Sequence, residues 1–228
     1  MNWIVRLPNW VGDTLLALPA VAGLREAHPG RLWLAGRDAP LQLARIAFPD
    51  LPAIPLRAAH DPAELVRSAA GARRTGSQAG LLLVPSFSAA LWLWLARLRR
   101  RVGWAAEGRS ALLTRALPRP VRGSRHLRDE FIDLAREAQG ERFPDLPELP
   151  SDPATRAAAQ EFLAPLGEAG ERAPLIALCP GARYGSAKQW PLSQVSALAR
   201  RLAQRGARGV VVGTAAEGAA AARIVAAA

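Results

Sequence analysis

The stretch WIVRLPNWVGDTLLALP (residues 3–19) joins a short apolar run, a loop and the start of a helix. The apolar run at 3–7 predicts a buried strand, and the residues from 14 onward have helical spacing. Further strand candidates at 31–36 and 80–84 alternate with expected helices at 39–47, 62–74, 90–100 and 124–139. Short buried strands separated by helices predict an α/β fold with a doubly wound parallel sheet that is covered on both faces.

Four prolines between residues 141 and 153 interrupt this alternation and indicate a domain boundary. We therefore expect a complete N-terminal Rossmann-like domain at 1–150, a connecting segment with a helix at 151–173, and a partial second domain at 174–228. The last part contains only two strand candidates, LIAL (175–178) and RGVVVG (208–213). Because α/β sheets usually have about five or six strands, we expect this domain to be incomplete and the chain to end early.

The net charge of +11 and the pI near 11.5 indicate an anionic partner, which is a nucleic acid, an acidic membrane face or a phosphorylated substrate. The alternative is that the arginines are simply spread over a solvated surface. A single cysteine, Cys179, excludes an internal disulfide, and we expect it to be buried. Three scattered histidines and the lack of a D-x-D motif argue against a metal site.

The N-terminus lacks the features of a signal peptide, so a cytoplasmic protein is expected. The apolar segment 81–96 is shorter than the ~20 residues of a spanning helix and is interrupted by Pro85, Ser86 and Ser88. It is interpreted as a buried strand, a loop and an apolar helix. Trp92 and Trp94 precede a run of arginines and are suited to a membrane surface, but packing in the core is favoured.

Three loops follow strands, where open parallel sheets bind ligands. In the first, Gly12 permits a close backbone approach or a positive φ, and Asp13 is either a helix N-cap or a functional carboxylate. In the second, Ser86 and Ser88 either cap the next helix or face a substrate.

The third loop, CPGARYGSAKQWP (179–191), contains Gly181, Gly185, Ser186 and Lys188. Free backbone N–H groups with one cation suit a phosphate or pyrophosphate. The loop contains neither a Walker A motif nor G-x-G-x-x-G, and the alternative is a solvated loop with a surface lysine.

Together these loops resemble the lipopolysaccharide heptosyltransferases, which are glycosyltransferases of the GT-B fold. The matching segments are NWVGDTLLALPAV, LLLVPSFSAAL, RVGWAAEGRSALLTRALP, CPGARYGSAKQWP and VVVGTAAE, in the order of the family. The W-x-G-D and G-x-x-K-x-W-P forms favour type II over type I. The resemblance implies two Rossmann-like domains, the first facing a lipid acceptor and the second holding ADP-heptose.

The resemblance also implies an activity: metal-independent, inverting transfer of heptose from ADP-L-glycero-D-manno-heptose to the first heptose of the lipopolysaccharide inner core, without a cofactor. It makes Asp13 the catalytic base and places the acceptor against Trp10, Gly12, Ser86 and Ser88. It assigns the donor to Gly181, Ser186, Lys188 and Glu217. The implied partners are ADP-heptose, the lipid A–core acceptor and the inner leaflet of the inner membrane, to which the protein would be peripheral. No nucleic acid is expected.

Two alternatives remain open. One is another GT-B glycosyltransferase or a sugar-nucleotide epimerase, against which the W-V-G-D loop argues. The other is a non-catalytic basic module that binds anionic lipid headgroups or nucleic acid. The segment WLWLARLRRRVGW mixes aromatic and basic residues as such a module does, but no nucleic-acid-binding signature is present.

Overall fold

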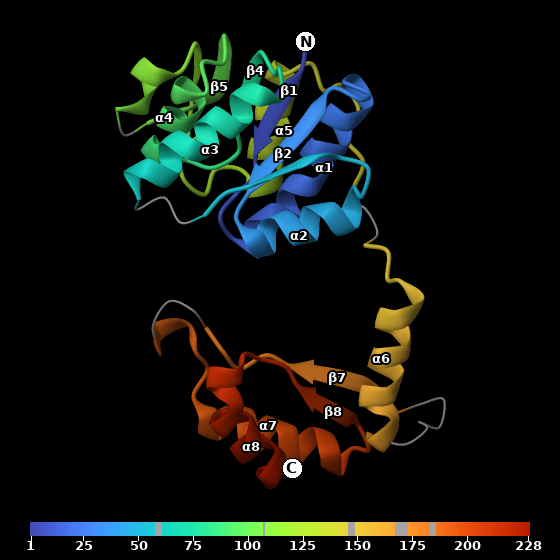
Figure 1. Cartoon of the computed structure of the whole chain (residues 1–228). Coiled ribbons are helices and arrows are strands. Elements are labelled where there is room, and N and C mark those ends of the chain that lie inside the picture. Colours follow the sequence, from blue (N-terminus) through green and yellow to red (C-terminus); the bar gives the residue numbers. More distant parts are fainter. Residues whose placement is uncertain (58–60, 107, 146–148, 167–172, 183–185) are drawn as a thin grey trace. The chain divides into compact units, whose positions relative to one another are not determined.

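The computed structural model describes residues 1–57, 61–106, 108–145, 149–166, 173–182 and 186–228. Its internal contacts divide the chain into two units, Met1–Pro150 (unit 1) and Ser151–Ala228 (unit 2). Each unit has a parallel sheet of its own (Figure 1). The helix expected in the connecting segment is α6, Pro153–Leu163, and it belongs to unit 2.

Unit 1 is built on six parallel strands in the order β3-β2-β1-β4-β5-β6. The strands are β1 Trp3–Arg6, β2 Leu32–Gly36, β3 Ala53–Pro55, β4 Ala79–Leu82, β5 Arg100–Ala105 and β6 Arg115–Pro118. Strands β2 and β3 extend the sheet from β1 in one direction, and β4, β5 and β6 extend it in the other. This is the doubly wound parallel arrangement, and the predicted fold class is confirmed.

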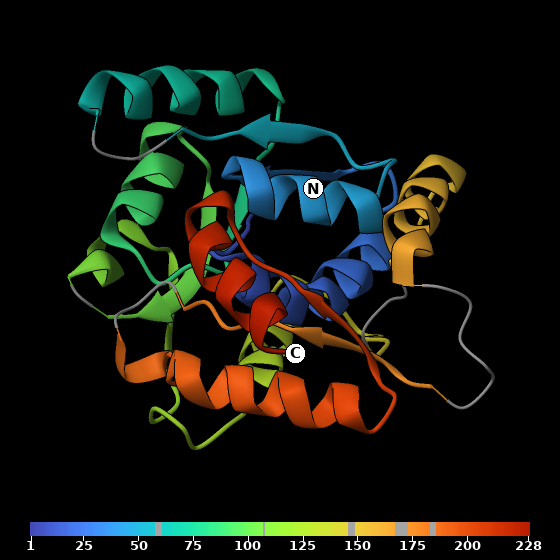
Figure 2. The ribbon, with the colours of Figure 1, turned by 90° about the horizontal axis from the view of Figure 1, so that it is seen from below.

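Helices cover both faces of this sheet (Figures 1 and 2). One apolar cluster contains residues of α1, α2 and α5, and a second contains residues of α3 and α4. The helices are α1 Val11–Ala27, α2 Asp38–Ala47, α3 Pro62–Arg74, α4 Phe87–Leu95 and α5 Leu127–Glu137, and a 3₁₀ turn, η1, spans Arg109–Leu112.

Strand β1 shows why the sheet must be covered twice. Trp3 and Val5 belong to the cluster of α1 and α5, whereas Ile4, between them, belongs to the cluster of α3 and α4. All four residues of β1 are buried. Since side chains alternate between the faces of a strand, a continuous apolar run requires an apolar layer on each face.

The order of the strands fixes the place where the sheet can bind a ligand. The chain leaves β1 through α1 to reach β2 on one side, and it later returns through α3 to β4 on the other side of β1. The connections after β1 and β4 therefore run to opposite faces and diverge. This is the topological switch point, where open α/β sheets form a crevice at the carboxyl ends of the strands.

Three predictions about unit 1 need correction. Strands β3, β5 and β6 were missed. The edge strands β3 and β6 are short and only partly buried, so neither has a continuous apolar run, and β5 begins at Arg100, which the expected helix included. The helix expected at 90–100 ends at Leu95, because Arg97 adopts a positive φ of 59° and the chain enters β5 at Arg100. Trp92 packs in the core, as favoured, but Trp94 is half exposed.

Unit 2 contains a two-stranded parallel sheet, β7 Leu175–Leu178 and β8 Arg208–Val211, and the three helices α6, α7 and α8 among its described residues. Helix α7 spans Leu192–Gln204 and α8 spans Gly218–Ala227, and they pack against each other around a small core of Val195, Ala199 and Ile224. Short 3₁₀ turns occupy Ala164–Leu166 (η2), Ser186–Lys188 (η3) and Ala215–Glu217 (η4).

The described residues of unit 2 cover one face of its sheet only. In β7, Ile176 and Leu178 are half buried, while Leu175 and Ala177 alternate with them and are exposed. Cys179 follows on the exposed side, so the prediction of a buried cysteine is wrong. No helix among the described residues is long and apolar enough to span a membrane.

Two helical glycines of unit 1 give a matched test of its packing. A Cβ at Gly23 in α1 would lie 2.5 Å from the backbone oxygen of Arg142 and 2.6 Å from the ring of Phe143, whereas a Cβ at Gly71 in α3 would meet nothing within 4 Å. We predict that Gly23→Ala lowers the free energy of unfolding by about 1–3 kcal/mol through overpacking. Gly71→Ala should raise it by about 0.5–1 kcal/mol through helix propensity. Urea unfolding followed by tryptophan fluorescence measures both, and effects of the same sign would contradict the packing described.

Candidate functional site

The loop between β1 and α1 is held by the first turn of the helix. The backbone oxygen of Trp10, the N-cap residue, accepts hydrogen bonds from the backbone N–H and the Oγ1 of Thr14, each 2.9 Å long. Thr14 is fully buried, so this turn is anchored in the core. Asp13 is the third residue of the helix and is half buried beside that anchor.

Asp13 lines a cavity of about 280 Å³ at the switch point. Residues of the β1–α1 loop, of the β4–α4 loop and of α5 surround it, so the cavity lies where the two connections diverge. Its polar lining residues are Asn9, Trp10, Asp13, Ser86, Arg119 and Glu130. The structure thus brings together three residues that the sequence singled out, Trp10, Asp13 and Ser86.

The side chain of Asp13 is not a helix cap, so that structural interpretation is wrong. The N-cap is Trp10, and its side chain makes no capping hydrogen bond. Among the described residues, Asp13 has no hydrogen-bond or ion-pair partner. Burial raises the pKa of Asp13 above its ordinary value of 3.8, although the helix N-terminus by itself favours the charged carboxylate. A half-buried carboxylate with no partner is suited to accept a proton or a hydroxyl hydrogen bond from a ligand.

A second carboxylate in the same cavity, Glu130 on α5, was missed from the sequence. Glu130 is 6% exposed, and its Oε2 is buried without a hydrogen bond from the described residues. The nearest cation is Arg119, whose Nε lies 3.6 Å from that oxygen. The available signal was the position of Glu130 on the apolar face of an amphipathic helix, three residues after Leu127 and four before Leu134.

The two serines of the β4–α4 loop have different roles in the structure. Ser86 caps α4, since its Oγ accepts a 3.3 Å hydrogen bond from the backbone N–H of Ala89. Its Oγ also lies 2.8 Å from the Oγ of Ser88. Ser86 lines the cavity of Asp13, while Ser88 lines a neighbouring cavity that Ser86 shares. Ser86 therefore caps α4 and also lines the candidate site.

Gly12 does not need glycine's freedom for its own backbone. It has no positive φ, which contradicts one of its two interpretations. A Cβ at this position would meet nothing within 4 Å, and the residue is exposed. The described residues therefore place no steric requirement for glycine at this position.

In unit 2, Glu217 is fixed by a capping box at η4. Its Oε2 accepts hydrogen bonds from the backbone N–H of Thr214, at 2.6 Å, and from the Thr214 hydroxyl, at 2.9 Å. The backbone hydrogen bond first, and then the hydroxyl bond, lower the pKa of Glu217 below its ordinary value. A Cβ at Gly181 would overlap Oε1 of Glu217, and one at Gly213 would lie 2.8 Å from Oε2. Glycine at both positions makes room for this carboxylate.

Gly181 and Glu217 line a cavity of about 410 Å³ together with Trp190 and Gln189. Lys188 is exposed on the 3₁₀ turn η3, which immediately precedes Gln189, and it is not among the residues that line this cavity. Gly185 and the side chain of Ser186 lie outside the described part of the chain. The structure therefore brings Gly181 and Glu217 together and places Lys188 nearby in sequence.

Within the described residues, no group of three or more His, Cys, Asp or Glu side chains is arranged to hold a metal ion. Arg119 lines the cavity of Asp13, and no cation among the described residues lines the cavity of Glu217.

An α/β fold with polar residues gathered at the switch point defines a class of ligand-binding α/β proteins. The sequence profile of glycosyltransferase family 9 (heptosyltransferase) matches residues 72–228, and the chain belongs to this family. Lipopolysaccharide heptosyltransferase 2 of Salmonella typhimurium is 28% identical over 94% of the chain, and lipooligosaccharide heptosyltransferase 2 of Haemophilus ducreyi is 29% identical over 90%. The chain spans 64% and 61% of the lengths of these two relatives.

Solved structures agree with this assignment. The structure of ADP-heptose LPS heptosyltransferase II from Escherichia coli matches the whole chain with a TM-score of 0.76 and 25% identity, and the chain covers 69% of it. E. coli heptosyltransferase WaaC with ADP-2-deoxy-2-fluoro heptose has the same fold, with a TM-score of 0.67 and 19% identity over 99% of the chain and 73% of that structure.

The raised pKa of Asp13 predicts a stability effect with a defined sign. As pH rises, the unfolded chain releases this proton first, so the free energy of unfolding falls between the unfolded and the folded pKa. Asp13→Asn should therefore raise the melting temperature at pH 7, and the difference should vanish near pH ~3, below both values. Asp38→Asn, at an exposed acid in the first turn of α2, should not raise it. Thermal unfolding across this pH range checks the prediction, and a gain that persists at low pH would contradict it.

Proposed function

We propose that the protein transfers heptose from ADP-L-glycero-D-manno-heptose to the first heptose of the lipopolysaccharide inner core. The observation that carries the proposal is the carboxylate of Asp13, which has no partner among the described residues and lines a cavity at the switch point, in a chain of glycosyltransferase family 9. The names of the relatives support lipopolysaccharide as the acceptor. The similarity to the Escherichia coli ADP-heptose LPS heptosyltransferase II supports ADP-heptose as the donor.

In this mechanism Asp13 is the general base. An acceptor hydroxyl attacks the anomeric carbon of heptose, the bond from that carbon to the diphosphate oxygen breaks, and ADP departs from the opposite face. The hydroxyl proton passes to the Asp13 carboxylate as the new C–O bond forms. The raised pKa of Asp13 strengthens it as a base, and the absence of a competing partner among the described residues leaves its oxygens for the acceptor. Trp10, Gly12, Ser86 and Ser88 would line the acceptor side.

The donor would be bound by unit 2. The backbone around Gly181, with Ser186 and Lys188, would hold the diphosphate, whose negative charge grows as the bond to the sugar breaks. Oε2 of Glu217 is engaged by Thr214, which leaves Oε1 to accept a hydrogen bond from a ribose hydroxyl. Since the proposed mechanism uses Lys188 and loop amides in place of a metal ion, transfer should proceed in EDTA.

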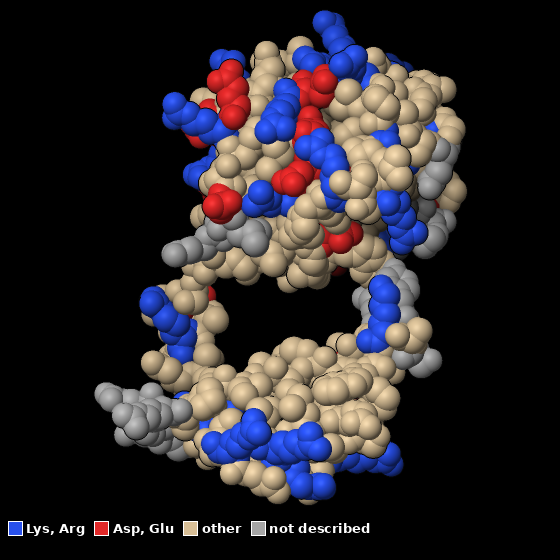
Figure 3. Space-filling view, turned by 180° about the vertical axis from the view of Figure 1, so that it is seen from behind, with Lys and Arg blue, Asp and Glu red and all other residues tan. Residues whose placement is uncertain are grey.

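We also propose that the protein works at the cytoplasmic face of the inner membrane as a peripheral protein. On the face drawn in Figure 3, basic and acidic side chains are interleaved over unit 1, whereas unit 2 shows mainly basic ones. Exposed arginines of unit 2 include Arg156 on α6 and Arg200, Arg201 and Arg205 at the end of α7. Such a surface attracts the anionic headgroups of the leaflet and the phosphates of the acceptor.

The base is tested by Asp13→Asn in the protein expressed from its complete reading frame. Turnover in heptose transfer should fall by at least about 10²-fold, while the affinity for ADP stays unchanged, because the base acts only on the acceptor hydroxyl. The reaction is followed in EDTA with inner-core lipopolysaccharide that carries one heptose. Asp38→Asn is the control and should retain activity. Turnover near that of the wild type would exclude Asp13 as the base.

The donor site is tested by Lys188→Ala. Loss of a charge-assisted contact costs about 1.5–3 kcal/mol, so the Kd for ADP should rise by roughly 10–100-fold. Isothermal titration with ADP measures it in the same full reading frame. Arg201→Ala removes an equally exposed positive charge from α7 and should change the Kd little. Equal effects of the two substitutions would indicate general electrostatic attraction and not a diphosphate contact.

A further inference from the structure

A second cavity of unit 1 lies beside that of Asp13 and contains a concentration of positive charge. It measures about 300 Å³, and Asn9 and Ser86 line both cavities. Arg6 at the end of β1, Arg37 directly after β2 and Arg57 after β3 also line it. Each of three neighbouring parallel strands therefore places an arginine at the carboxyl-terminal end of the sheet.

Arg6 is a buried cation whose hydrogen-bond partners among the described residues are both neutral. It is 7% exposed, and its guanidinium donates to the backbone oxygen of Leu7 and, at 2.6 Å, to Oδ1 of Asn9. Burial first, and then the nearby charge of Arg37, lower the pKa of Arg6 to about 10. The half-buried Arg37 has no hydrogen-bond or ion-pair partner among the described residues. Two like charges, one buried and one half buried, thus line the same cavity, which is unfavourable unless an anion is bound.

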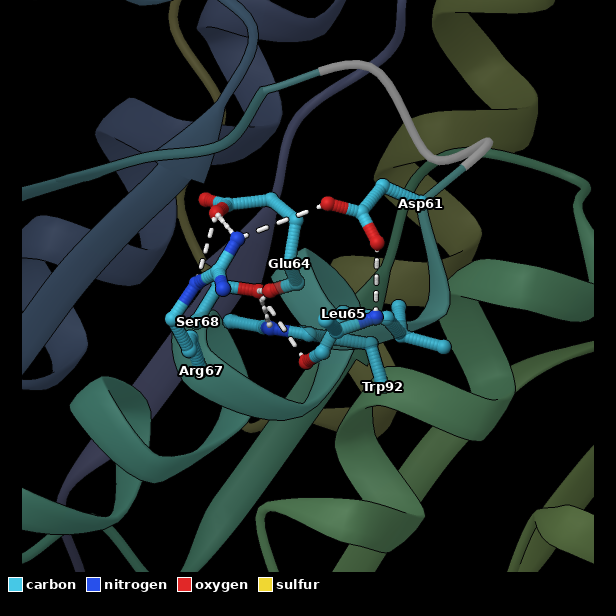
Figure 4. A network of polar contacts seen from close by, with 7 residues as sticks. Asp61, Glu64, Leu65, Arg67, Ser68 and Trp92 are labelled. Carbon is cyan, nitrogen blue, oxygen red and sulfur yellow. Dashed lines mark hydrogen bonds and ion pairs between the residues drawn. The ribbon is translucent and has the colours of Figure 1, made fainter.

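The carboxylate that Glu64 contributes to the lining is already paired with another arginine. Its Oε2 accepts hydrogen bonds of 3.0 and 3.2 Å from Arg67, which also reaches Asp61 at 3.4 Å (Figure 4). Ser68 and Trp92, which also line the cavity, are uncharged and hydrogen-bonded to each other. Ser68 accepts a 3.1 Å hydrogen bond from Nε1 of Trp92 and donates to the backbone of α3 (Figure 4).

Two hydroxyl groups at the start of α4 also line this cavity. Ser86 and Ser88 stand at the N-terminus of α4, where the helix dipole favours negative charge. A cavity of this size accommodates one sugar unit with its substituent. Arginine and serine side chains around a positive cavity are the groups that bind phosphate and carboxylate oxygens.

We propose that this cavity binds an anionic substituent, a phosphate or a carboxylate, of the molecule whose hydroxyl reaches Asp13. The proposal rests on the proposed function in that this molecule is the sugar acceptor. Because the two cavities share Asn9 and Ser86, an anion held by Arg6 and Arg37 would place the adjoining sugar beside the base. Arg6 and Arg37 would then be binding residues that select charged acceptors over neutral ones.

The test measures binding alone, so it does not depend on heptose transfer. The 228-residue chain is titrated calorimetrically with glucose 6-phosphate, glucuronate and glucose, which share a ring and differ in charge. We expect at least one anionic sugar to bind, with an affinity that falls as salt is added, and glucose to bind at least about 10-fold more weakly. The two anionic arms identify the substituent as phosphate or carboxylate.

Arg37→Gln should weaken the anionic sugar by about 10–100-fold, and Arg6→Gln should do the same. Arg31→Gln, at an exposed arginine outside the cavity, is the control and should leave binding unchanged. Without ligand, Arg37→Gln should unfold at the same or a higher temperature than the wild type, since it removes repulsion. A lower melting temperature would indicate a structural role for Arg37 and overturn the proposal.

Equal binding of glucose, or anion binding that survives both substitutions, would also overturn it. Loss of heptose transfer together with intact, Arg37-dependent anion binding would count against the proposed function and leave this site standing.

Discussion

Strand β1 is hydrogen-bonded to β2 on one edge and to β4 on the other, and side chains cover both of its faces. Its backbone is therefore hydrogen-bonded on both edges and its side chains are buried, so the chain can change partners only where the strand ends. There the connection to α1 leaves toward one face, and the connection after β4 leaves toward the other. The cavities of Asp13 and of Arg6 both lie at this divergence.

Charged residues also gather at this carboxyl-terminal end of the sheet. Arg6 and Glu130 are among the few charged residues buried in unit 1, and the half-buried Asp13 shares the cavity of Glu130, while Arg6 lines the neighbouring one. None of these three groups has an oppositely charged partner within hydrogen-bond distance among the described residues, and each carries a desolvation cost. The two apolar clusters on the faces of the sheet supply the stability that tolerates this cost. Buried charged groups that lack an oppositely charged partner are characteristic of sites where a ligand binds.

Unit 2 also carries polar groups at the ends of its parallel strands, but its carboxylate is hydrogen-bonded. The loop after β7 brings Gly181 against Glu217, which follows β8, so the carboxyl ends of neighbouring parallel strands again supply the polar groups. Here the carboxylate is held in its charged form by the hydrogen bonds of Thr214. Asp13 and Glu217 are thus two acids with opposite shifts in pKa, one suited to take a proton and the other suited to remain an acceptor of hydrogen bonds.

The sequence by itself determined the class of fold and most of the loops of the site. Apolar runs such as 3–7 and 80–84 can be read locally, because a strand buried on both faces must be apolar throughout. Asp13 and Gly181 were found because strand-end loops carry ligands in this class, and the family resemblance rested on the same loops. The edge strands β3 and β6 escaped because partial exposure removes that apolar pattern. Tertiary structure alone decided that Glu130, 117 residues after Asp13, faces the same cavity. It also decided that Arg6, Arg37 and Arg57 meet at one edge of the sheet, because strand pairing, and not spacing along the chain, sets which strand ends are neighbours.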